Sequence, residues 1–153
     1  MCIRDSIHII SHAEANSRNV DLSHIVFSEG DRGAESWEKL YVGELYSLRF
    51  LADLIILSAC ETGTGKEERG EGLLSLSRAF TYAGCDNVVS TLWKTKGQTT
   101  KEIMNSFHGN LKGEMSISKA LGEAQRKFIQ NRPGTLPFSW AGIISIGDVT
   151  AIY

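Results

Sequence analysis

The chain has 153 residues, of which 42% are hydrophobic and 22% charged, a length and composition typical of one folded domain and not of a disordered segment. Its net charge of −2 gives no electrostatic basis for direct contact with nucleic acid. No apolar run approaches the roughly 18 residues of a membrane span, so we expect no membrane contact. The three cysteines include no CxxC pair and are too few for a disulfide framework, which favours a reducing compartment such as the cytoplasm.

Short apolar runs, each followed by polar residues, predict the strands of a sheet. The run at 52–58 is continuously apolar at its centre, as in a strand that is buried on both faces. Such strands belong to parallel sheets whose two faces are covered by helices. The expected strands span residues 7–10, 22–28, 52–58, 87–93 and 140–146.

Apolar residues at spacings of three and four predict helices between these strands. The clearest helix runs over 71–83 and ends at Gly84, because glycine is favoured just after a helix. The glycine-rich, charged stretch 63–72 before it predicts an exposed loop. The other expected helices span 41–49, 99–111 and 117–128. This alternation indicates a mostly parallel α/β sheet with right-handed crossovers.

Two residues with the chemistry of a cysteine peptidase follow predicted strands. His12 comes after the strand at 7–10, and Cys60 comes after the strand at 52–58. Reacting groups in open parallel sheets gather at the carboxyl ends of the strands, and a thiol nucleophile needs a base that the fold brings close. The separation of 48 residues agrees with the roughly 50 that lie between the histidine and cysteine of caspases. Taken singly, each residue is as well explained by a structural role.

The strings around these two residues resemble one family. Residues 58–63 read Ser-Ala-Cys-Glu-Thr-Gly, a specific string of the CHAT domain, the caspase-like domain associated with tetratricopeptide repeats. Supporting similarity lies at 11–16, 70–72, 77–80, 83–84, 88–93 and 140–148. The resemblance implies a caspase-like three-layer α/β sandwich with a mostly parallel sheet flanked by helices, lacking its N-terminal elements.

The resemblance also implies a role for each residue of the site. His12 falls on the catalytic histidine of the family, and Cys60 falls on its nucleophile. The backbone N–H groups of Ala13 and Cys60 would face the developing oxyanion. Ser58 and Glu61 would contact the substrate.

The implied activity is that of a cysteine endopeptidase that cleaves peptide bonds through an acyl-enzyme, latent in isolation and regulated by other parts of its protein. The implied partners are a protein or peptide substrate and tetratricopeptide-type repeats in the same full-length chain, or a regulatory partner protein. The alternative is a catalytically silent CHAT-like scaffold or signalling module. We expect no cofactor and no metal. We expect residues 1–6 to be a non-native or disordered leader, and 7–150 to be the domain, the C-terminal portion of a longer protein.

Two other kinds of site are not supported by the sequence. The stretch 63–66, Gly-Thr-Gly-Lys, lies between a predicted strand and a helix, but Cys60 and Glu67 stand where a phosphate-binding loop needs Gly and Ser or Thr. No motif with the spacing of metal ligands predicts a metal site at His8, His12, His24 and Cys60.

The remaining histidines and Cys85 fit structural roles. His8 alternates with apolar neighbours and is expected to be a core or interface histidine. We expect His24 and His108 to be structural or surface residues, and Cys85 to be a buried thiol at a helix end. One departure from the family pattern lies at 94–98, Lys-Thr-Lys-Gly-Gln, where many relatives carry acidic or capping residues. This departure bears on substrate preference.

Overall fold

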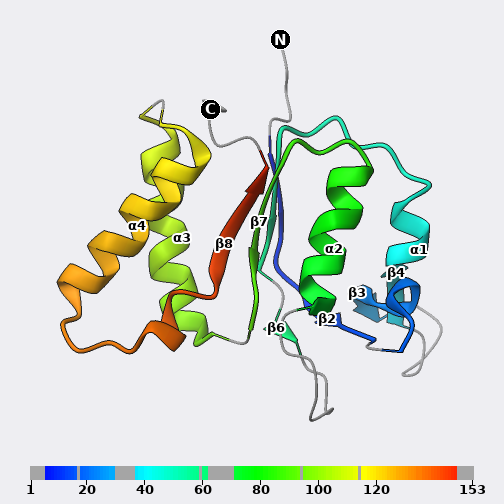
Figure 1. Ribbon diagram of the computed structural model, residues 1–153, viewed down its shortest axis with the longest axis horizontal. Coiled ribbons are helices and arrows are strands. Elements are labelled where there is room, and N and C mark those ends of the chain that lie inside the picture. Colours follow the sequence, from blue (N-terminus) through cyan, green and yellow to red (C-terminus); the bar gives the residue numbers. More distant parts are fainter. Residues whose placement is uncertain are drawn as a thin grey trace.

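A four-stranded sheet divides the molecule into two helical layers (Figure 1). The computed structural model describes residues 6–16, 18–29, 37–58, 60–61, 71–93, 95–113 and 115–147. The strands of the sheet are, in spatial order, β1 (Ser6–Ile9), β5 (Leu54–Leu57), β7 (Asn87–Thr91) and β8 (Ile143–Gly147). The first three run parallel, and β8 pairs antiparallel with β7. The predicted α/β architecture with a mostly parallel sheet is confirmed.

Helices cover both faces of this sheet. On one side lie α1 (Val42–Leu45) and α2 (Glu71–Tyr82), and on the other lie α3 (Gly97–Leu111) and α4 (Ile117–Asn131) (Figure 1). Ile55 of β5 packs in the core on the α2 side, whereas its neighbour Ile56 packs in the core with α3 and α4. Every residue of β5 and β7 is buried, because alternate residues of a strand face opposite sides. This explains why 52–58 reads as continuously apolar.

A second sheet, which the sequence did not predict, lies beyond the carboxyl ends of β1 and β5. Its order is β4 (Trp37–Tyr41), β3 (His24–Glu29), β2 (His12–Glu14) and β6 (Cys60–Glu61). Strands of two and three residues, such as β6 and β2, are too short to show the alternation by which a strand is recognised in a sequence. His12 and Cys60 do follow β1 and β5, as expected, but each begins a further short strand.

The predicted helix at 41–49 is wrong in extent, because β4 reaches Tyr41 and α1 ends at Leu45. The other helices are confirmed, with α2 ending at Tyr82 ahead of Gly84, whose φ is +100°. Two short 3₁₀ helices, Val20–Leu22 and Pro137–Ser139, complete the described elements. No helix in the described ranges has both the length and the apolar character required to cross a bilayer.

Candidate active site

The pairing of β1 with β5 continues into the pairing of β2 with β6. Ile9 lies opposite Leu57 in the first pair, and His12 lies opposite Cys60 in the second, so both pairs join residues 48 apart in the chain. Between them, the Ser58 N–H donates to the Ile9 carbonyl at 2.9 Å. The ladder therefore keeps one register across the break between the two sheets. The separation of His12 and Cys60 in the sequence is therefore the same 48-residue offset by which β1 pairs with β5.

Opposed residues of adjacent strands lie about 4.8 Å apart along the hydrogen-bonding direction and share a face of their sheet. His12 and Cys60 are thus brought together at the carboxyl end of the large sheet. For Cys60 and Glu61 the structure describes the backbone alone, so their predicted side-chain roles lie outside the described residues. The loop at 62–70 lies outside them as well.

Strand β2 is held on both sides. It pairs antiparallel with β3, where His12 lies opposite Val26, and parallel with β6. The Ser11 hydroxyl donates a hydrogen bond to the Val26 carbonyl, which fixes the chain just before His12. Ala13 is fully buried in the core on the α2 side. The backbone position of His12 is therefore anchored by its own neighbours in sequence and by β3.

The side chain of His12 is exposed and makes no hydrogen bond to any residue within the described ranges. Among the described residues, then, no hydrogen bond holds this imidazole away from a reacting group. The commoner structural role of a strand-end histidine, in which the backbone satisfies its ring, is not seen in the described part of this site.

Ser58, the predicted substrate-binding residue, is half-buried two positions before Cys60. Its hydroxyl forms a hydrogen bond with Nε2 of His8, at 2.9 Å. The ring of His8 in turn lies 5.5 Å from the ring of His108 on α3. These three side chains, which we call the His–Ser–His cluster, were not connected by any spacing in the sequence.

Of the two expected roles of His8, core or interface histidine, the core role is wrong. His8 is exposed, because β1 is an edge strand of its sheet. Partial burial of the ring, and then the nearby charge of His108, lower the pKa of His8. Partial burial, and then the charge of Lys112, lower the pKa of His108. Both rings are therefore held toward the neutral form.

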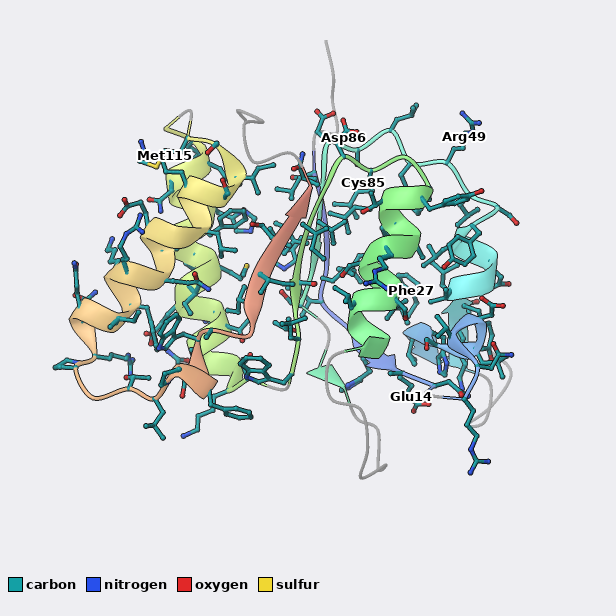
Figure 2. All side chains as sticks on the ribbon, in the orientation of Figure 1. Glu14, Phe27, Arg49, Cys85, Asp86 and Met115 are labelled. Atoms are coloured by element: carbon teal, nitrogen blue, oxygen red, sulfur yellow. The ribbon has the colours of Figure 1, made fainter. Side chains whose placement is uncertain are left out.

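Cys85 has the chemistry of a structural thiol, as predicted. It is free and buried, and its Sγ donates to the Asn87 carbonyl at 3.1 Å. Burial is the main cause that raises the pKa of this thiol. Figure 2 shows Cys85 and Asp86 at one end of the molecule and Glu14, on β2, at the opposite end. Cys85 is therefore remote from His12 as well as protonated.

His24 is structural, as predicted. It is buried on β3, with Nδ1 at 3.1 Å from the Leu22 carbonyl and Nε2 at 3.5 Å from a carboxylate oxygen of Glu14. No group of three or more His, Cys, Asp and Glu side chains in the described ranges is arranged to hold a metal ion.

Comparison with known proteins identifies the family. The sequence profile described as "CHAT domain" matches residues 4–148, which is nearly the whole chain. The chain belongs to the CHAT-domain family. This family is related to cysteine peptidases, and the match includes the residues of the β2–β6 pair.

Two curated relatives of this CHAT domain are repeat proteins. It is 31% identical over 109 residues to Tetratricopeptide repeat protein 28 of Mus musculus, and 28% identical over 109 residues to Tetratricopeptide repeat protein 28 of Homo sapiens. Each match covers 71% of this chain and only 4% of the relative. The chain thus corresponds to one small part of those proteins, in a family that occurs together with tetratricopeptide repeats.

Proposed function

We propose that this CHAT domain is a cysteine peptidase that uses His12 and Cys60 as a catalytic dyad. The observation that carries the proposal is the register of β2 and β6, in which these residues are directly opposed at the carboxyl end of the sheet. A catalytic dyad needs a short distance between its two residues. One residue lies on β2 and the other on β6, and the backbone pairing of these two strands supports such a distance.

In the proposed reaction the His12 ring accepts the proton of the Cys60 thiol, and the thiolate attacks the carbonyl carbon of the substrate. The C–N bond of the peptide then breaks, and the protonated His12 gives its proton to the leaving amine. A water molecule hydrolyses the resulting thioester and regenerates the free thiol. The exposure of the His12 ring supports its place in this reaction.

Backbone N–H groups of Cys60 and Ala13 are the proposed oxyanion donors, and one such donor is worth about 3 to 4 kcal/mol of transition-state stabilisation in other enzymes. Ala13 lies in β2 with Ile25 on one side and Glu61 on the other. Its N–H therefore points toward a neighbouring strand. We expect the two-residue pairing with β6 to loosen when a substrate arrives, which is a structural reason for latency in isolation.

Ser58 and Glu61 flank Cys60 in sequence and are the proposed substrate contacts. Repeats in the full-length protein, or a partner protein, are the proposed regulators, in keeping with the repeat proteins to which the chain is similar. The competing function is a silent scaffold or signalling module in which the dyad is retained without turnover. Both functions keep the dyad, and they differ in one measurable property, which is turnover of a peptide substrate.

Reactivity is tested by labelling with a small thiol electrophile in a Cys2→Ser background. We expect Cys60 to be modified rapidly and Cys85 slowly, because Cys85 is buried with a raised thiol pKa. His12→Ala should lower the labelling rate of Cys60 by at least about tenfold and leave that of Cys85 unchanged.

Cleavage of a fluorogenic peptide library, by this chain and by the full-length protein, then separates enzyme from scaffold. We expect turnover that disappears in Cys60→Ala. Equal turnover in the wild type and in Cys60→Ala would refute the peptidase function. Labelling that is fast and dependent on His12, without turnover in either protein, would support the silent module.

A further inference from the structure

Strand β1 has one open edge. β5 pairs with one side of it, and among the described residues no strand pairs with the other side. The Ile9 carbonyl accepts a hydrogen bond from Ser58, which follows β5, so the backbone groups of Ile9 face β5. Alternate residues of a strand point their N–H and C=O groups in opposite directions. The backbone groups of Ser6, His8 and Ile10 therefore face the open edge.

Apolar side chains are also left uncovered at this edge. Ile7 and Ile9 pack against the core on the α2 side, yet both are only half-buried. Ile10, which follows the strand, is 76% exposed. β1 contains no lysine, arginine, carboxylate or proline, the residues that usually protect an open edge from further pairing. The edge is therefore suited to accept another strand.

β8 and β4 are also edge strands, but each carries such a protection. The side-chain amide of Gln125 on α4 donates to the carbonyls of Trp140 and Ile143, at 3.2 and 2.8 Å, so α4 covers the first part of β8. β4 carries Glu38 and Lys39, both of which are exposed. Charges and a covering helix both oppose association between edges. β1 has neither protection on its open side in the described part of the chain.

A second copy of β1 is complementary to this edge. Antiparallel pairing about a two-fold axis at His8 would set His8 opposite itself, with the outward N–H and C=O groups exchanged between the copies. Ser6 would then lie opposite Ile10 of the other copy, and the backbone groups of both face the edge. Ile7 would lie opposite Ile9, so their side chains would extend the α2-side core across the axis. Neither strand brings a formal charge that would oppose this contact.

From these observations we propose that the open edge of β1 is a self-association surface, at which two copies of this domain join their large sheets through an antiparallel β1–β1 pair. The joined sheet runs from β8 of one copy to β8 of the other. Because the two β1 strands run in opposite directions, the two His12–Cys60 pairs lie at opposite ends of the joined sheet. The inference does not depend on the proposed peptidase function.

Sedimentation equilibrium of this chain under reducing conditions measures the association. The contact is small, so we expect the mass to rise from that of one chain, 16.8 kDa, toward twice this value between about 5 and about 500 μM. In dilute solution β1 remains an edge strand. The outward N–H of His8 then exchanges rapidly with solvent, and its exchange should slow as the dimer forms.

Two variants block the edge and leave the pairing of β1 with β5 in place. Ile10→Lys adds a charge at an exposed position beside the edge, and His8→Pro removes an outward N–H group. Each should weaken the association by about tenfold or more. Leu136→Lys is the matched control, because Leu136 is 72% exposed and follows α4, away from β1. It should leave the association unchanged.

Cross-linking tests the register of the pair. In a Cys2→Ser, Cys60→Ala background, where the remaining Cys85 is buried, His8→Cys should give a disulfide-linked dimer on oxidation. Opposed hydrogen-bonded residues have Cα atoms about 5.5 Å apart, which a disulfide can span. Ile10→Cys should give none, because the two copies of residue 10 would lie at least about 13 Å apart along the paired strands.

A chain that remains monomeric at the highest concentration would overturn the inference, as would an association that Ile10→Lys and His8→Pro both leave unchanged. Cross-linking through Ile10→Cys without cross-linking through His8→Cys would also overturn it. A full-length protein that is monomeric while its His8 amide is protected from exchange would refute it in favour of a strand from elsewhere in the same protein.

Discussion

At the scale of single residues, the two rings of the His–Ser–His cluster have a consequence for stability that is independent of any substrate. Folding lowers the pKa of both His8 and His108, mainly through partial burial. In the unfolded chain a histidine has a pKa of about 6.5. The unfolded chain therefore binds protons more readily than the folded chain at mildly acidic pH. The two imidazoles contribute fully to stability at a pH where they are neutral in both the folded and the unfolded chain. This contribution is lost as the pH falls and the unfolded chain binds protons.

We therefore expect the free energy of unfolding to fall as the pH is lowered from about 7.5 to about 5.5. His8→Gln and His108→Gln should each flatten this dependence, because glutamine does not titrate. Urea unfolding at several pH values measures the slope. A slope that is the same in the wild type and in both variants would show that the two imidazoles are not held neutral by the fold.

Individual thiols also differ by environment. The Cys85 thiol is buried and donates to a backbone carbonyl, whereas Cys60 lies in a two-residue strand opposite His12. Both cysteines follow apolar stretches of the sequence, so hydrophobicity alone does not separate them. We expect their reactivity to differ, because one lies at the end of a helix and the other at the carboxyl end of a parallel strand.

At the scale of elements, helix ends and short strands shape the site. Gly84 ends α2 with a φ of +100° and passes the chain to β7, which follows within a few residues. A Cβ at Gly84 would meet the Phe50 carbonyl oxygen at 3.2 Å. This turn therefore needs glycine for both its backbone conformation and its close contact.

Two glycine substitutions are expected to have opposite effects. Gly84→Ala should destabilise the protein by about 1 to 2 kcal/mol, the cost of a left-handed conformation for an L-residue. Gly109→Ala should stabilise it by about 0.5 to 1 kcal/mol, because Gly109 is exposed within α3 and a Cβ there meets nothing within 4 Å. Denaturant unfolding measures both changes. Effects of the same sign would contradict the helix-end role of Gly84.

At the scale of the whole molecule, one sheet serves two cores. The α2 core and the α3–α4 core lie on opposite faces of the large sheet, and the apolar residues of its central strands β5 and β7 belong alternately to each. Neither helical layer retains its core without these strands. The two layers should therefore unfold together as one cooperative unit.

Hydrogen exchange provides the measurement. Backbone amides of β5 and β7 should exchange most slowly, with a free energy that equals that of global unfolding. Amides of β1 and β6 should exchange faster, because β1 is an edge strand and β6 contains two residues. Two separate unfolding transitions, or β1 amides protected as strongly as those of β5, would disprove the single cooperative unit.

The large sheet was predictable because its signals are local. Residues 52–58 and 87–93 are apolar runs bounded by polar residues, and the helices that follow them have a clear period. Of the second sheet only β3 was predictable, from the stretch 22–28, because β2 and β6 are too short for any period. The extent of the helix at 41–49 was misjudged for a related reason, since β4 takes its first residue, Tyr41.

The sequence by itself determined the α/β order, the two buried central strands and the pairing of His12 with Cys60 as candidates. It did so because hydrophobic periodicity and chain spacing are properties of the sequence alone. Only the tertiary structure decided that 48 residues is the register of one continuous ladder, and that His8, Ser58 and His108 converge. The convergence depends on how α3 lies against an edge strand, which is a contact between distant segments that no local pattern encodes.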